Sequence, residues 1–159
     1  MIDKKRIKYL IMDIDGTLTD GKLNYSEKGL LFKSFNAKDG YAIKEILPNY
    51  DIEPIVISGN QSKINDERFN DLGVTKVYQS VNDKLSLCEK LVNNDFSCVA
   101  YIGDDLNDLA AIVKIRSSGG VTGCPADSVF QIIDNCDFVS SKNGGDGAVR
   151  EFIEWLTKS

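Results

Sequence analysis

The sequence predicts an α/β fold in which a parallel sheet carries helices on both faces. Short apolar runs typical of buried strands recur along the chain, and helical patterns separate them. This alternation requires crossover connections, so we expect a Rossmann-like sheet. The 159 residues, 42% of them hydrophobic, suffice for one core and predict a single domain over residues 1–159. Strands are predicted at residues 9–13, 54–58, 76–78, 98–103, 119–121 and 137–139.

The predicted helices rest on apolar spacing and on residues that begin or end a helix. A helix over residues 39–47 is expected to end before Pro48, and a helix over 62–72 begins at Ser62. The C-terminal helix has one continuous apolar face, which makes its pattern the clearest. The remaining helices are predicted over residues 83–93, 107–114, 126–133 and 147–157.

Residues 22–36 interrupt this alternation directly after the first strand. Two strand-like stretches flank residues 26–29, whose sequence Ser-Glu-Lys-Gly is typical of a hairpin turn. The interval between Asp13 and Ser58 is too short to hold this hairpin, the following helix and an independent cap domain. We therefore predict an uncapped fold with a small β-hairpin flap.

Acidic side chains follow two of the predicted strands. Asp13 and Asp15 end the first strand and share one face of it, because successive strand side chains alternate. Two carboxylates about 4 Å apart repel by roughly 4 kcal/mol at an effective dielectric constant of 20, so a cation or a reaction is expected there. Acids that only cap the following turn are the ordinary alternative. A second strand releases Asp104, Asp105 and Asp108.

The same edge of the sheet should collect these acids. Ligands of open parallel sheets bind outside the carboxyl ends of the strands, and adjacent strands would bring Asp13 and Asp104 together. Carboxylates and a carbonyl are the ligands that Mg²⁺ prefers. The chain contains no histidine, which excludes imidazole catalysis and most zinc sites. We therefore predict a Mg²⁺ site.

Two further residues suit a phosphorylated substrate. Ser58 ends another strand and offers a hydroxyl donor, and Lys84 begins a helical run and offers a positive charge. Each is weak evidence alone, because serines are common in strand-to-helix turns and most lysines lie in solvent. Their order along the chain relative to the acids carries the argument.

Composition excludes several classes of partner. A net charge of −5 without a basic stripe argues against nucleic acid and against anionic membranes. No run approaches the roughly 18 apolar residues that cross a bilayer. The cysteines lack metal-site or redox-motif spacing, so we expect reduced core residues. These features predict a cytoplasmic protein.

The motif order Asp-x-Asp-Gly-Thr, Ser, Lys and Gly-Asp-Asp-x-x-Asp resembles the haloacid dehalogenase (HAD) superfamily of phosphatases over nearly the whole chain. Within that superfamily, segments 13–22, 35–44, 123–127 and 144–151 look like 3-deoxy-D-manno-octulosonate (KDO) 8-phosphate phosphatase. Related groups are the 9-phosphate phosphatases for KDN and N-acetylneuraminate. A phosphatase-like domain fused to some acylneuraminate cytidylyltransferases is also related.

The resemblance implies a Mg²⁺-dependent phosphatase that hydrolyses the phosphate monoester of a sugar acid. Asp13 matches the nucleophile, which forms an aspartyl-phosphate, and Asp15 matches the general acid and base. The metal is then held by the carboxylates of Asp13 and Asp104 and by the backbone carbonyl of Asp15.

Four further residues surround the transferred phosphoryl group in this resemblance. Ser58 and Lys84 bind its oxygens. Asp105 and Asp108 lie behind the metal ligands, where Asp108 orients a metal-bound water or Lys84.

Substrate recognition is implied position by position. Lys38 and Lys44 stand where arginine is common, and Asn60 replaces another arginine. Because lysine cannot clamp a carboxylate bidentately and asparagine is uncharged, the sugar acid stays open between KDO 8-phosphate and the two 9-phosphates. Solvated helix faces are the alternative for Lys38, Lys44 and Arg68. The matching substrate positions are Asp15, Asn36, Lys38, Asp39, Gly40, Lys44, Gly59, Asn60, Arg68 and Lys84.

The resemblance also implies a homotetramer. In such proteins the hairpins pack together and C-terminal segments approach the neighbouring active site, which would bury Leu30, Leu31 and Phe32. A hairpin folded onto its own subunit is the ordinary alternative.

Two rival functions fit the sequence less well. A receiver domain would carry a phosphate-accepting aspartate near the position of Ser58. A catalytically idle oligomerisation domain would have no reason to keep Asp13, Asp15, Lys84 and Asp104 together, because clustered acids are costly without a metal.

Overall fold

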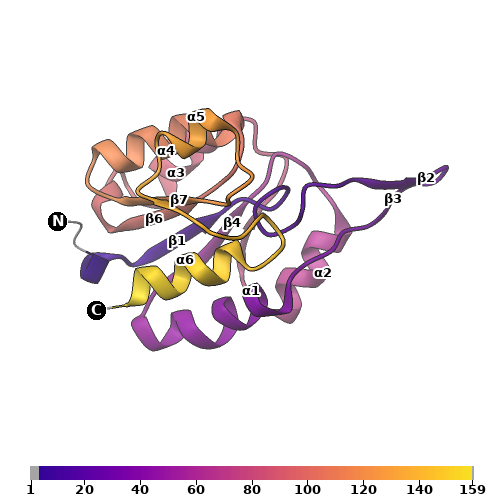
Figure 1. Cartoon of the computed structure of the whole chain (residues 1–159), viewed down its shortest axis with the longest axis horizontal. Helices are drawn as coiled ribbons and strands as arrows, with labels where there is room; N and C mark the ends of the chain where they lie inside the picture. Colours follow the sequence, from indigo (N-terminus) through magenta and orange to yellow (C-terminus); the bar gives the residue numbers. More distant parts are fainter. Residues whose placement is uncertain (1–3, 159) are drawn as a thin grey trace.

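The computed structural model describes residues 4–158 and contains a six-stranded sheet whose strands all pair in parallel. The sheet order is β5-β4-β1-β6-β7-β8, so the central strand β1 lies between β4 and β6 (Figure 1). This confirms the predicted α/β fold; residues 1–3 and 159 of the predicted domain lie outside the described part. The strands are β1 (Tyr9–Met12), β4 (Glu53–Ile57), β5 (Lys76–Tyr78), β6 (Val99–Ile102), β7 (Val121–Cys124) and β8 (Phe138–Val139).

Helices cover both faces of the sheet (Figure 1). One face packs Met12, Val56 and Ile102 against residues 42–47, α2 and α6, and the other packs Ile11 and Tyr101 against α3, α4 and α5. Because alternate residues of the buried strands point to opposite faces, both sides of the sheet need apolar residues. The α-helices are α1 (Ala37–Tyr41), α2 (Lys63–Asp71), α3 (Lys84–Leu91), α4 (Leu106–Ser117), α5 (Phe130–Ile133) and α6 (Ala148–Thr157). Short 3₁₀ turns are η1 (Lys4–Arg6) and η4 (Phe96–Cys98).

The first helical segment continues past the predicted end at Pro48. After α1 the chain forms a π-helical turn, η2 (Ala42–Ile46), and then a 3₁₀ turn, η3 (Leu47–Tyr50). Pro48 lies in the first turn of η3, where its missing N–H requires no acceptor. The segment ends at Asp51, which adopts the left-handed conformation with φ 54°.

The predicted helix over 126–133 is shorter than expected. Only α5, its second half, is helical. In the first half, Ala126 N–H donates to the Lys142 carbonyl and Val129 N–H donates to the Asp104 carbonyl. These tertiary hydrogen bonds hold the backbone in a turn beside the end of β6, which local propensity does not reveal.

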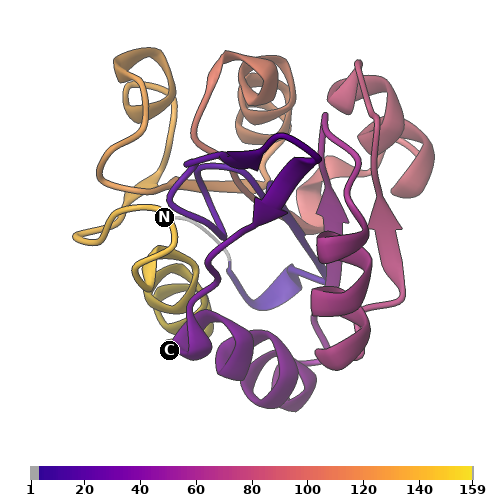
Figure 2. The ribbon, with the colours of Figure 1, turned by 90° about the vertical axis from the view of Figure 1, so that its right-hand side faces the viewer.

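The predicted flap is an antiparallel hairpin of β2 (Asn24–Ser26) and β3 (Gly29–Phe32). It projects from the edge where the parallel strands end (Figure 1), and the view onto this edge shows it in front of the sheet (Figure 2). An isolated antiparallel bridge between Thr19 and Phe35 joins its returning arm to the turn after β1. The flap is therefore fixed at its base beside the end of the central strand.

Two predictions from composition can be compared with the described residues. Within residues 4–158, no helix combines the length and the apolar character that a bilayer crossing needs. Cys88, Cys98, Cys124 and Cys136 are all free thiols.

Candidate active site

A cleft of about 480 Å³ opens at the carboxyl ends of β1, β4 and β6. This position follows from the topology, because strand order reverses next to β1 and the loops on its two sides diverge. Most of the predicted catalytic residues line it, together with backbone from the turns after β1 and β4. The lining residues are Asp13, Asp15, Gly16, Gly21, Leu23, Ser58, Gly59, Asn60, Val81, Asn82, Asp104, Asp105 and Asn107.

Asp13 is held by a buried lysine. It directly follows β1 and is only 4% exposed. Lys84, the first residue of α3, places its Nζ 2.6 Å from Asp13 Oδ1 and 2.6 Å from Asp108 Oδ1. A buried ammonium group needs such partners, so the lysine fixes the orientation of Asp13 beneath the cleft.

Asp108 has all its hydrogen-bonding capacity engaged by the protein. Its Oδ1 accepts from Lys84 Nζ and from the Tyr101 hydroxyl, each at 2.6 Å. Its Oδ2 accepts from the backbone N–H groups of Asp104 and Asp105 at 3.1 and 3.4 Å. Burial raises the pKa of Tyr101 well above its usual value, which keeps the hydroxyl a donor. Asp108 therefore organises the loop after β6.

Asp13, Asp104 and Asp108 form the acidic cluster of the described residues, with ligand atoms all within 4.8 Å of one another. Because Asp108 is saturated, Asp13 and Asp104 remain to bind a cation. Thr17 Oγ1 donates to Asp104 Oδ1 at 2.9 Å and orients that carboxylate. Three carboxylates and the single ammonium of Lys84 leave two negative charges, which suits a divalent cation.

The carboxylates of this cluster are difficult to ionise without a cation. Burial raises the pKa of Asp13 well above its usual value, Asp108 raises it further, and Lys84 only partly opposes this effect. Burial also raises the pKa of Asp104 to about 6. For Lys84, burial lowers the pKa, but Asp13 and Asp108 outweigh burial and the net shift is upward. A bound divalent cation would stabilise both acids as anions.

Gly16 lets the turn after β1 approach the cluster. Its φ is +93°, and a Cβ placed there would lie 2.0 Å from Asp104 Oδ2. Only glycine permits both this backbone conformation and this contact. The glycine of the Asp-x-Asp-Gly-Thr motif is therefore required because the carboxylate of Asp104, at the end of the neighbouring strand, occupies the space that a side chain would need.

Asp15 is held by two donors from different segments. Lys33, which directly follows β3, places its Nζ 2.6 Å from Asp15 Oδ1, and its side chain is only 2% exposed. Asn60 Nδ2 donates to Asp15 Oδ2 at 3.2 Å. Asn60 comes from the turn after β4, so the flap and the sheet each contribute one contact.

Ser58 lies at the end of β4 and is 1% exposed. Its Oγ accepts from the backbone N–H of Asn60 at 3.2 Å. The hydroxyl proton therefore remains to donate to an oxygen in the cleft, which it lines.

Known proteins resemble this chain over most of their length. A comparison with models of protein families found none that matches. The KDO 8-phosphate phosphatase KdsC of Escherichia coli (strain B / BL21-DE3) is 38% identical over 160 residues, which cover 98% of this chain and 82% of the relative. The chain belongs to the KDO 8-phosphate phosphatase family.

Solved structures of this family agree. The cobalt-bound phosphatase of Haemophilus influenzae has a TM-score of 0.88 at 36% identity, covering 96% of this chain and 88% of the other. The Moraxella catarrhalis phosphatase, solved with magnesium, phosphate and KDO, has a TM-score of 0.88 at 34% identity, covering 98% and 88%. The protein is thus a HAD-type phosphoric monoester hydrolase, as the motifs predict.

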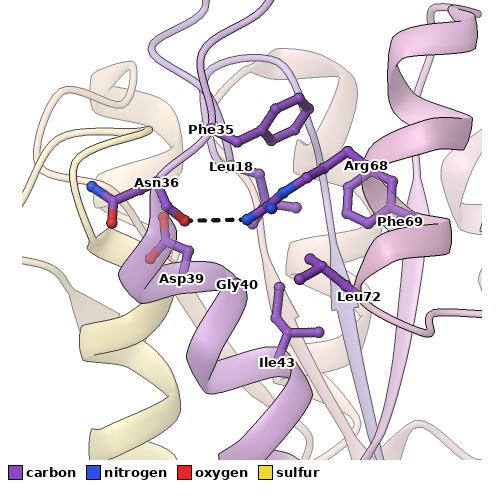
Figure 3. Close-up of a pocket in the computed structure, with 9 residues that line it drawn as sticks. All are labelled: Leu18, Phe35, Asn36, Asp39, Gly40, Ile43, Arg68, Phe69 and Leu72. Carbon is purple, nitrogen blue, oxygen red and sulfur yellow. Dashed lines mark hydrogen bonds between the residues drawn. The ribbon is translucent and has the colours of Figure 1, made fainter.

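Several positions that the family resemblance assigns to substrate lie away from the cleft. Asn36, Asp39, Gly40 and Arg68 surround a separate small pocket between α1 and α2 (Figure 3). There the Arg68 guanidinium donates to the Asn36 carbonyl at 3.4 Å, and Asp39 accepts from the backbone N–H of Arg150 at 2.7 Å. Within this chain these residues do not face Asp13.

The two predicted lysines of α1 and η2 are also outside the cleft. Lys38 is exposed, and Lys44 Nζ donates to the Asp71 carbonyl at 3.2 Å. Gly59 and Asn60, by contrast, line the cleft beside Ser58. Apart from Asp15 and Lys84, the predicted substrate residues that adjoin the acids therefore come from the turn after β4.

Sequence reasoning missed three residues that support the site. Thr17 belongs to the quoted motif, yet nothing assigned its hydroxyl to Asp104. In the sequence, Tyr101 is one more residue of an apolar strand, and only the structure shows that its hydroxyl donates to Asp108. Lys33 follows apolar residues of the flap that are themselves exposed, so no local pattern signals that its own side chain is buried.

Proposed function

We propose that the chain hydrolyses the phosphate monoester of a sugar acid, KDO 8-phosphate, with Mg²⁺ as cofactor and through an aspartyl-phosphate. The observation that carries this proposal is the pair Asp13 and Asp104, which adjoin one cleft with an excess of negative charge. Relatives over nearly the whole chain are phosphatases for this substrate.

The residues that would hold Mg²⁺ are the carboxylates of Asp13 and Asp104 and the backbone carbonyl of Asp15. The donor set fits, because all are oxygen ligands and the acids lie within one cluster. When bound, the ion neutralises charge and lowers the repulsion between Asp13 and an incoming phosphate.

Asp13 would act as the nucleophile. Lys84 binds its Oδ1 and so presents the carboxylate in one orientation, which favours in-line attack on phosphorus by a free carboxylate oxygen. Ser58 would donate its hydroxyl proton to an oxygen of the transferred group. Attack by water on the phosphorus of the aspartyl-phosphate would then restore Asp13 and release phosphate.

Asp15 would serve as general acid and base. It lies two residues after the nucleophile Asp13 in the sequence and lines the same cleft. In the first step it would give a proton to the departing alcohol oxygen, and in the second it would take one from the attacking water. Its carboxylate oxygens would exchange this proton within the cleft, so their placement decides how well each step proceeds.

The metal requirement gives the first test. Purified protein should release phosphate from KDO 8-phosphate with Mg²⁺ and lose that activity with a chelator. Equal rates in both conditions would refute the metal assignment.

Asp13→Asn tests the covalent step. The variant should lose turnover while its melting temperature stays near that of the parent, and retained turnover would refute the covalent step.

Substrate identity needs a panel, because Asn60 brings an uncharged side chain to the cleft where an arginine is common in the family. Rates on KDO 8-phosphate should exceed those on the 9-phosphates of KDN and N-acetylneuraminate by at least about tenfold. A flat profile would show that the site does not select among these sugar acids.

We also infer a homotetramer in which the flap contacts other subunits. Apolar side chains on the flap are strongly exposed: Tyr25 by 68%, Leu31 by 61%, Leu23 by 52% and Phe32 by 49%. A cluster of this kind on a projecting hairpin is typical of an interface. Burial between copies would also supply the cover that the open cleft lacks.

A further inference from the structure

The flap carries a buried cation that the family resemblance did not assign to the site. Lys33 directly follows β3, and its side chain is only 2% exposed, although lysines are almost never buried unless paired. Its Nζ lies 2.6 Å from Asp15 Oδ1. Its partner Asp15 is 18% exposed, so the pair lies at the boundary between the interior and the cleft.

The backbone fixes where this lysine stands. Phe35, two residues further on, forms an antiparallel bridge with Thr19 in the turn that follows Asp15. This bridge therefore joins the returning arm of the flap to the turn that carries Asp15. Lys33 reaches Asp15 from a backbone that is tied to the same turn.

The second oxygen of Asp15 is held from the opposite side. Asn60 Nδ2 donates to Asp15 Oδ2 at 3.2 Å, while Asn60 N–H donates to Ser58 Oγ. Both oxygens of the Asp15 carboxylate thus accept a hydrogen bond, one from Lys33 on the flap and one from Asn60 on the turn after β4. Asp13 has an equivalent partner in Lys84, so each of the two aspartates has its own lysine.

We propose that Lys33, with Asn60, is a positioning residue that aims the Asp15 carboxylate at the leaving-group oxygen. This inference rests on the proposed function, in which Asp15 protonates the departing alcohol. The flap is then part of the catalytic machinery of its own subunit as well as an apolar surface. A displacement of the acid by about 1 Å is expected to cost on the order of 10²-fold in rate.

Leaving-group chemistry separates this role from a merely structural one. The alcohol of KDO 8-phosphate needs a proton to depart, whereas the nitrophenolate of 4-nitrophenyl phosphate departs without one. Since kcat/KM reports only steps up to the first irreversible one, it isolates the phosphoryl transfer that Asp15 assists. A misplaced acid should therefore slow the first ester and spare the second.

The test compares kcat/KM on both esters for the parent, Lys33→Met and Lys33→Arg. Lys33→Met should lose about 10²-fold on KDO 8-phosphate and less than about threefold on 4-nitrophenyl phosphate. Lys33→Arg should recover much of the loss. Asp15→Asn should show the same selective loss on KDO 8-phosphate. The double variant Asp15→Asn/Lys33→Met should have a kcat/KM less than about threefold below that of Asp15→Asn, because both substitutions act through one group.

Two results would overturn the inference. Equal losses on the two esters, or full additivity with Asp15→Asn, would mean that Lys33 does not act through Asp15. If Lys33→Met does not fold, Asn60→Ala alters an exposed side chain and must show the same selective loss, in smaller degree. An inactive parent would instead refute the proposed function, and with it this inference.

Discussion

At the scale of single residues, the site depends on close approach between two strand ends. Asp104 packs against Gly16, and Thr17 of the same turn donates to it, so the ends of β1 and β6 are matched to each other. The sequence predicted that Asp13 and Asp104 would meet, because adjacent parallel strands share an edge. It did not predict the supporting hydrogen bonds, since these join residues far apart in the chain.

Gly16→Ala tests this matching. The added methyl group would lie 2.0 Å from Asp104 Oδ2, so Asp104 must shift and the Mg²⁺ dissociation constant should rise at least about tenfold. Isothermal titration calorimetry measures this constant. Gly29→Ala is the matched control, because Gly29 shares a positive φ, +107°, but has no atom within 4 Å of the added group. Similar Mg²⁺ affinities in both variants would contradict the account.

At the scale of elements, most strands and helices follow from apolar periodicity, whereas two helix ends and the bounds of one strand do not. The strand predicted over 119–121 is β7 (Val121–Cys124), which begins where the prediction ends. Pro48 was expected to end a helix, but a helix that narrows from π to 3₁₀ geometry accommodates it. The segment before α5 is held in a turn because its N–H groups donate to the carbonyls of Asp104, after β6, and of Lys142 in a distant loop. Both departures come from tertiary contacts that no local pattern encodes.

The start of α6 also depends on a tertiary contact, and this contact is sensitive to pH. Asp39 is 1% exposed, and its Oδ1 accepts from Arg150 N–H at 2.7 Å. Its Oδ2 has no hydrogen-bond partner among the described residues. Burial raises the pKa of Asp39 from 3.8 to about 6.

The sign of the pH dependence follows from that shift. Between pH 4 and 6 the folded chain retains a proton on Asp39 that the unfolded chain loses, so this group makes the free energy of unfolding fall as pH rises. The fall between these pH values amounts to about 2 kcal/mol.

Asp39→Asn should remove this contribution. Urea unfolding of the parent and the variant at pH 4 and pH 7 gives the measurement. The parent should lose stability relative to the variant by about 2 kcal/mol between these values, because other acids cancel in the difference. A constant difference between the two proteins would show that Asp39 ionises normally.

At the scale of the whole molecule, the cleft opens at the carboxyl ends of the strands, and the flap, with its exposed apolar side chains, projects from the same edge of the sheet. Figure 2 shows the hairpin in front of this edge. The sequence predicted the flap and the missing cap, because the interval after β1 is short. Of the substrate positions carried over from the family, Asp15, Gly59 and Asn60 line this cleft, whereas Asn36, Asp39, Gly40 and Arg68 line the pocket between α1 and α2. Within one subunit, Arg68 therefore lines the pocket between α1 and α2 and not the cleft.

Leu31→Glu tests whether the flap holds subunits together. Leu31 is 61% exposed, and a carboxylate buried between copies would lack a partner, so the variant should sediment as a smaller species than the tetramer that we propose for the parent. Phe130→Glu is the matched control, because Phe130 is 69% exposed on α5, away from the flap. Unchanged sedimentation of Leu31→Glu would place the interface elsewhere.

The most direct measurement of the central claim is to find the transferred phosphoryl group on the protein. KDO 8-phosphate and Mg²⁺ are mixed with the protein, the reaction is quenched in acid within milliseconds, and the peptide that contains Asp13 is examined by mass spectrometry. The account predicts a phosphorylated Asp13 that is absent with chelator and in Asp13→Asn. Rapid phosphate release with no phosphorylated Asp13 at any quench time would contradict it.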